Sequence, residues 1–185
     1  MPYPIYEFGG SGPVLHLAVA NGFPPATYRP LLEPLTRRYR VVSLLTRPLW
    51  PDPPPPTDLA SWRDLAADLL EGLRAYSLTD VIAVGHSLGG VLSLLAVLAE
   101  PGRFRALALL DPVILPPRVM FAIRLVRALG LHAHLPLVQG ALRRRAQFSS
   151  HEEAFDYWRN KPLFEGWPEE TLRLYARSMT RPAAS

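Results

Sequence analysis

The stretch Asp80–Gly90, DVIAVGHSLGG, decides the fold together with the SLLAVLA that follows it at Ser93–Ala99. Apolar residues lie on both sides of a central Gly-His-Ser-Leu-Gly. This hydropathy profile is compatible with a membrane span or with a buried strand that turns sharply into a helix. The sequence favours the turn, because three glycines and a His-Ser pair interrupt the ~20 apolar residues that a span requires.

Gly85-His86-Ser87-Leu88-Gly89 matches the pattern G-x-S-x-G between a strand and a helix. In this setting the serine occupies a strained turn at the carboxyl end of the strand. Gly85 and Gly89 keep side chains away from the turn, and the amide of Leu88 at the helix start can stabilise an oxyanion. Ser87 is therefore predicted to be a nucleophile. The alternative is a structural serine in a glycine-rich turn.

Strands and helices alternate over the first part of the chain, and the strands are apolar on both faces. This pattern predicts an α/β fold whose mostly parallel sheet has helices on both faces, within a core of residues 1–115. The expected strands are Ile5–Phe8, Val14–Ala20, Val41–Leu45, Val81–Val84 and Ala106–Leu110. The expected helices are Thr27–Tyr39, a second one capped by Thr57 or Asp58 and ending near Tyr76, and Leu88–Leu98.

The pattern changes after Pro117, where no further strand is expected. The periodicity predicts helices over Arg118–Leu129, Leu137–Phe148, Glu152–Arg159 and Glu169–Met179. Residues 116–185 are therefore predicted to form a helical cap or lid segment.

Composition narrows the class of protein. The 185 residues include no cysteine, which excludes disulfides and thiolate chemistry and predicts a cytoplasmic location. The start of the sequence does not resemble a signal peptide.

Six arginines and no acid lie between residues 112 and 150. We expect a solvated helical face there, with an anionic membrane surface or ligand as the alternative and without nucleic acid, because no nucleic-acid motif accompanies the charge.

The segments around Ser87 resemble the α/β-hydrolase superfamily. A second stretch, Asn21-Gly22-Phe23-Pro24, is similar to the His-Gly-Phe-Pro loop of that superfamily, with Asn21 in place of the histidine. The resemblance implies that the N–H of Phe23 is the second oxyanion donor beside Leu88. It also implies esterase-like hydrolysis of a small apolar acyl substrate through a Ser87 acyl-enzyme, with no cofactor and no metal. The oligomeric state is not predicted.

The chain departs from the superfamily after its cap. There the acid and the histidine follow the last two strands, and only 98 residues follow Ser87. We therefore expect those strands to be missing, the domain to be truncated within its cap, and the edge strand Ala106–Leu110 to be open. Asp111 is the candidate acid, and a cap of the chain's exit from the sheet is its other interpretation.

No histidine has a position that the superfamily would give the base. The histidines considered are His16, a core residue by its strand position, His86, which neighbours Ser87 but points away, and His132, His134 and His151 in the helical segment. The spacing of His132 and His134 does not suit a zinc site on one helical face. A non-catalytic, hydrolase-like scaffold is therefore the alternative to a serine hydrolase.

Overall fold

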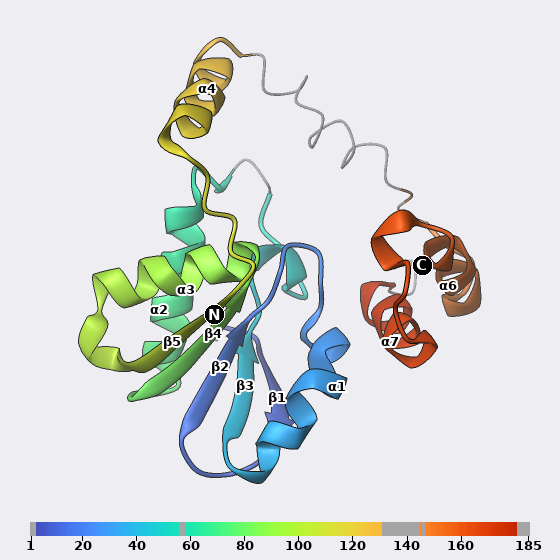
Figure 1. The fold of residues 1–185 in the computed structure, drawn as a ribbon, viewed down its shortest axis with the longest axis horizontal. Coiled ribbons are helices and arrows are strands. Elements are labelled where there is room, and N and C mark those ends of the chain that lie inside the picture. Colours follow the sequence, from blue (N-terminus) through green and yellow to red (C-terminus); the bar gives the residue numbers. More distant parts are fainter. Residues whose placement is uncertain (1–2, 56–57, 131–144, 146, 181–185) are drawn as a thin grey trace.

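Five strands form one sheet in the order β1-β3-β2-β4-β5 in the computed structural model, which describes residues 3–55, 58–130, 145 and 147–180 (Figure 1). The strands are β1 (Ile5–Gly9), β2 (Val14–Ala18), β3 (Arg40–Leu44), β4 (Val81–His86) and β5 (Phe104–Leu110). β1 pairs with β3 antiparallel, and the pairs β2–β3, β2–β4 and β4–β5 are parallel. The mostly parallel α/β sheet predicted from the sequence is confirmed.

Helices cover both faces of this sheet. On one face α2 (Trp62–Ala75) and α3 (Leu88–Ala99) bury leucines such as Leu69, Leu73 and Leu92 against Val42 and Val81. The other face carries a second apolar cluster under a helical segment that precedes β3. This segment consists of η1 (Pro25–Tyr28), α1 (Arg29–Leu32) and η2 (Glu33–Arg37).

The single helix predicted over Thr27–Tyr39 is wrong, because prolines divide that segment. Pro30 lies in the first turn of α1, and Pro34 lies in the first turn of η2. Proline has no amide hydrogen to donate to the preceding turn. Each short helix therefore has a proline in its first turn and does not continue the one before it.

The predicted start of α2 is also wrong. Ser61 is its N-cap, and the Ser61 side chain accepts a hydrogen bond from the Arg63 amide at 3.1 Å. The Asp64 carboxylate accepts in turn from the Ser61 amide at 2.8 Å, which completes a capping box. Asp58 lies before this cap, and Thr57 lies outside the described residues.

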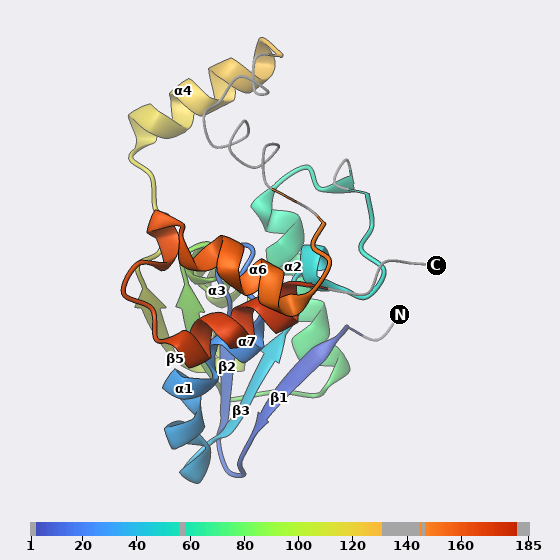
Figure 2. The ribbon, with the colours of Figure 1, turned by 90° about the vertical axis from the view of Figure 1, so that its right-hand side faces the viewer.

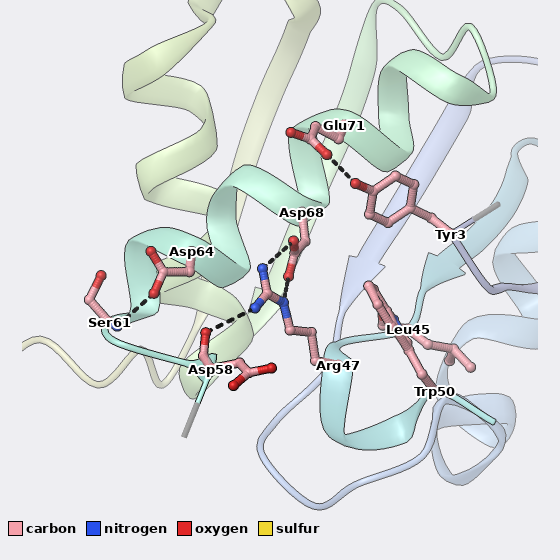
Figure 3. A network of polar contacts seen from close by, with 9 residues as sticks. All are labelled: Tyr3, Leu45, Arg47, Trp50, Asp58, Ser61, Asp64, Asp68 and Glu71. Carbon is pink, nitrogen blue, oxygen red and sulfur yellow. Dashed lines mark hydrogen bonds and ion pairs between the residues drawn. The ribbon is translucent and has the colours of Figure 1, made fainter. Parts of the chain in front are cut away.

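An ion pair fixes the proline-rich loop between β3 and α2. Figure 3 shows the Arg47 guanidinium facing the Asp68 carboxylate, with Nε–Oδ2 and Nη2–Oδ1 distances of 2.5 and 2.8 Å. The hydrogen bond to Asp68 raises the pKa of Arg47. Trp50 donates its indole N–H to the Leu45 carbonyl at 2.7 Å. The start of the loop forms a short 3-10 helix, η3 (Arg47–Leu49), which the ion pair connects to α2.

The chain after β5 is helical in the part that the structure describes. It contains α4 (Pro117–Ala128), α6 (His151–Arg159), η7 (Pro162–Phe164) and α7 (Glu169–Met179), and no strand follows Leu110 there. Of the predicted helix Leu137–Phe148, residues 137–144 and 146 lie outside the described residues. The division into a core and a cap at residue 115 stays a prediction.

Within this helical region, α4 lies apart from α6 and α7. Figure 1 shows α4 extending beyond the sheet, whereas Figure 2 shows α6 and α7 together over the side that carries α1. α7 contacts both α6 and η1. None of the helices in the described ranges is long and apolar enough to cross a bilayer.

β5 is an edge strand, as expected, because its only strand partner among the described residues is β4. Apolar side chains on and after it are exposed, including Leu110 and Ile114, and Phe121 and Leu125 on α4 are exposed as well. An open edge of this kind can pair with another strand.

We expect the Arg47–Asp68 pair to stabilise the fold. A double-mutant cycle with Arg47→Ala and Asp68→Asn should give a coupling free energy of about 1–2 kcal/mol, because the pair is bidentate and mostly buried. The exposed pair Arg40–Glu7, measured in the same way by urea unfolding, should give less than about 0.5 kcal/mol. Equal coupling in both cycles would contradict a structural role for the loop anchor.

Candidate active site

The chain reverses its direction at a single residue, Ser87. β4 ends at His86 and α3 begins at Leu88, so Ser87 alone connects strand and helix. Its backbone has φ 54° and ψ −118°, a conformation that non-glycine residues rarely adopt. The Ser87 carbonyl accepts from the Gly90 amide at 3.0 Å, and its own amide donates to the Leu110 carbonyl at 3.0 Å.

Glycines make this turn sterically possible. A Cβ on Gly89 would lie 2.1 Å from the carbonyl oxygen of Ala18 and 2.6 Å from that of Val19. A Cβ on Gly85 would lie 2.5 Å from the Gly89 oxygen. The clashing atoms belong to the backbone and have no rotamer by which to move away. The spacing of the motif is therefore set by the close approach of α3 to β4 and to the end of β2.

The two predicted oxyanion donors differ in their present bonding. The N–H of Leu88, at the first position of α3, forms no hydrogen bond with another described residue. The N–H of Phe23 donates to the Ala20 carbonyl at 3.1 Å, across a turn in which Gly22 has φ 77°. One of the two amides is thus available, and the other is bonded within its own loop.

His86 is directed toward η1. Its Nδ1 lies 2.7 Å from the Tyr28 hydroxyl oxygen, which also accepts from the Ala20 amide at 3.1 Å. Burial raises the pKa of Tyr28 to about 12, so the phenol is neutral and can donate its proton to His86. The loop after β2 and the end of β4 are held together through this phenol. Sequence reasoning missed Tyr28, because no motif or periodicity distinguishes it from other tyrosines.

Asp111 follows β5 in the same way that Ser87 follows β4. It also has a positive φ, of 44°, and it is exposed. Two backbone hydrogen bonds of Ser87 lie before and after Asp111 in the sequence. The Ser87 amide donates to the Leu110 carbonyl, and the Ser87 carbonyl accepts from the Val113 amide at 3.4 Å. The backbone of Asp111 is therefore next to Ser87. No hydrogen bond joins its carboxylate to any histidine that the structure describes.

The other two described histidines, His16 and His151, are hydrogen-bonded to groups other than Ser87. His16 is buried in β2, where its Nε2 accepts from the Leu44 amide at 3.0 Å. His151 begins α6, and its Nδ1 lies 2.5 Å from the Thr180 hydroxyl. His132 and His134 lie outside the described residues. Among residues 3–55, 58–130, 145 and 147–180, no histidine is hydrogen-bonded to the Ser87 hydroxyl, and no group of three metal-ligating side chains gathers.

A hollow of about 310 Å³ lies between the loop after β2 and the last helices. Its walls include Phe23, Trp158, Phe164, Leu163 and Met179. The Phe23 ring lies 5.5 Å from the Tyr175 ring and 5.9 Å from the Trp167 ring, measured between centroids. The same residue thus contributes its amide to the loop beside Ser87 and its side chain to the packing of α7.

Residues 14–185 match the model of the alpha/beta hydrolase family. The chain belongs to that family. No curated protein matches the sequence.

Solved structures of alpha/beta hydrolases and related enzymes share the fold. E-2-(acetamidomethylene)succinate hydrolase is 21% identical with a TM-score of 0.67, and the match covers 94% of this chain and 59% of that one. A hydrolase from Pseudomonas aeruginosa is 22% identical with a TM-score of 0.59, at 95% and 66% coverage. A marine microorganism esterase is 18% identical with a TM-score of 0.59, at 94% and 61%. The chain thus spans about three fifths of the length of such structures.

Replacing Gly89 should test the close approach at Ser87. We expect Gly89→Ala to lower the free energy of unfolding by at least about 2 kcal/mol, because the new methyl group overlaps two backbone carbonyls. Gly102→Ala is the matched control, since nothing lies within 4 Å of a Cβ there. Urea unfolding followed by circular dichroism measures both. Equal stability of the two variants would contradict the steric argument.

The buried His16 should make folding sensitive to acid. Burial lowers its pKa from 6.5 to about 4, so the unfolded chain takes up this proton at a higher pH than the folded one. Stability is then lost as the pH falls from about 6.5 towards 4, by about 2 kcal/mol at pH 5 relative to pH 8. His16→Gln should remove that part of the pH dependence in urea unfolding at the two pH values. An unchanged difference would show that His16 does not carry it.

Proposed function

We propose that the chain is a serine hydrolase domain in which Ser87 attacks the carbonyl of a small acyl ester. The observation that carries the proposal is the Ser87 turn, a strained serine between a buried strand and a helix whose first amide is unbonded. The strain is maintained by packing against backbone carbonyls, so it is built into the fold. Strain held in this way is typical of functional residues.

The proposed chemistry follows from the groups around the turn. The Ser87 oxygen forms a bond to the ester carbonyl carbon, and the carbonyl oxygen takes up negative charge. The Leu88 N–H donates to that oxygen, with the positive end of α3 behind it. The ester C–O bond breaks, and the alcohol leaves with the proton that the Ser87 hydroxyl gave up. Water then hydrolyses the acyl ester on Ser87, which restores the Ser87 hydroxyl and releases the carboxylic acid.

Phe23 would be the second oxyanion donor, as the resemblance to the family implies. Its amide already donates to Ala20 at 3.1 Å, so it must share that proton or turn away from Ala20 when an acyl group binds. Leu88 is therefore the principal donor in our proposal, and Phe23 contributes in the bound state. Asp111 is the proposed acid, because its backbone lies beside Ser87 at the same edge of the sheet.

A second candidate function is a non-catalytic, hydrolase-like binding protein. The observation in its favour is that no described histidine bonds the Ser87 hydroxyl or the Asp111 carboxylate. Without a base, the serine hydroxyl keeps its proton and is a weak nucleophile. The cytoplasmic location predicted from the lack of cysteine fits either function.

A fluorophosphonate probe distinguishes the two. If Ser87 is the nucleophile, the folded protein should be labelled covalently, Ser87→Ala should lose the label completely, and Ser77→Ala should keep it. Turnover of p-nitrophenyl butyrate should exceed that of Ser87→Ala at least about tenfold, as expected when general-base catalysis operates. Intact mass and circular dichroism provide the readouts.

Folded protein that takes no label would refute the hydrolase proposal and favour the binding protein. Labelling without turnover would mean that Ser87 is accessible and reactive but that deacylation lacks its base.

A further inference from the structure

The hollow beside Phe23 has aromatic walls. The loop after β2, α6, α7 and the segment between the two helices contribute its lining residues. The two helices contact each other (Figure 2). The rings of Phe23, Trp158 and Phe164 line it, and Tyr157 lines it on the side of α6. A volume of about 310 Å³ is at the small end of the range for small-molecule sites.

Among the residues that the structure describes, two cationic side chains and no acidic one line this hollow. They are not equivalent. Arg145 is neutralised, because its Nη2 lies 2.5 Å from Glu153 and its Nε donates to the Gln147 carbonyl at 2.8 Å. Lys161 forms no ion pair with any residue in the described ranges. It is also the only lysine of the chain.

The Lys161 ammonium has a defined place at the hollow. Its Nζ lies 4.2 Å from the centroid of the Tyr157 ring, within the range of a cation–π contact. That contact orients the charge without neutralising it. An ammonium over an aromatic face keeps its N–H donors for an anionic group, and a carboxylate can accept charge-assisted hydrogen bonds from them.

We propose that this hollow binds a small apolar carboxylate, with its hydrocarbon part against the aromatic rings and its carboxylate on Lys161. Resting on the proposed function, the substrate class is an ester that carries a second, anionic end. A neutral ligand of the same shape would fill the aromatic part and leave Lys161 without a partner. A cationic ligand would be repelled by the unpaired charge of Lys161.

The link to the reaction is Phe23. Its ring forms one wall of the hollow, and its amide belongs to the loop that approaches Gly89 through Ala18 and Val19. A ligand that contacts this ring contacts a residue of the turn in which the Phe23 amide donates to the Ala20 carbonyl. A ligand in the hollow therefore contacts the residue whose amide is the proposed second oxyanion donor.

The experiment compares two probes on the Ser87→Ala protein, so that binding does not depend on turnover. 4-Phenylbutyrate and 4-phenylbutan-1-ol have the same apolar part and differ in charge. By isothermal titration calorimetry we expect the carboxylate to bind roughly threefold to fivefold more tightly, as for a partly exposed ion pair. Lys161→Gln should reduce this preference to less than about twofold.

Arg159→Gln is the matched control. Arg159 is an exposed cation two residues before Lys161 in the sequence, and it does not line the hollow. Its Nη1 lies 3.7 Å from Oδ1 of Asp156. It should keep the preference for the carboxylate. Raising the salt from about 20 to about 300 mM should weaken the preference in the parent protein, because salt screens an exposed pair.

Tighter binding of the alcohol, or a carboxylate preference that survives in Lys161→Gln, would overturn the proposal. The two proposals fail separately. Carboxylate binding without fluorophosphonate labelling of the native protein would leave the hollow as a binding site and remove the hydrolase function. Labelling without carboxylate preference would keep the hydrolase function and remove the anionic substrate class.

Discussion

The structure depends on how closely α3 approaches the sheet. Gly89 lies so near the carbonyls of Ala18 and Val19 that a single methyl group would overlap them. This approach allows β4 to become α3 within one residue, and it forces Ser87 into a positive φ. The strain at Ser87 is offset by packing of α3 leucines such as Leu92 over the sheet. The strained backbone of Ser87 is thus a consequence of the core.

The same edge of the sheet collects the other polar groups of interest. Parallel strands place their carboxyl ends side by side, so residues that follow β2, β4 and β5 are neighbours although they are far apart in the sequence. Ser87 and Asp111 follow β4 and β5, each with a positive φ, and the Leu110 carbonyl joins them through the Ser87 amide. Tyr28 connects this edge to the loop after β2 through His86 and Ala20. The backbone at this edge fits the proposed acyl chemistry more fully than the side chains do.

The helices after β5 divide into two groups with different relations to this edge. α7 packs on η1 and surrounds the Phe23 ring with aromatic side chains, which places an apolar hollow next to the loop. α4 instead extends beyond the sheet and presents Phe121 and Leu125 to solvent (Figure 1). α7 therefore helps to form the hollow beside Phe23, whereas α4 has apolar surface available for contacts.

The sequence alone determined the strand order along the chain, the parallel character of the sheet and the position of Ser87. Each depends on local patterns, namely apolar runs, alternation and the spacing of two glycines. It did not determine where helices break, because Pro30 and Pro34 act within the first turns, or that Ser61 rather than Asp58 caps α2. Only the tertiary structure decided which groups meet: the Phe23 amide with Ala20, His86 with Tyr28, and Lys161 with an aromatic hollow. Contacts of this kind join distant segments, and their geometry depends on packing that no local pattern encodes.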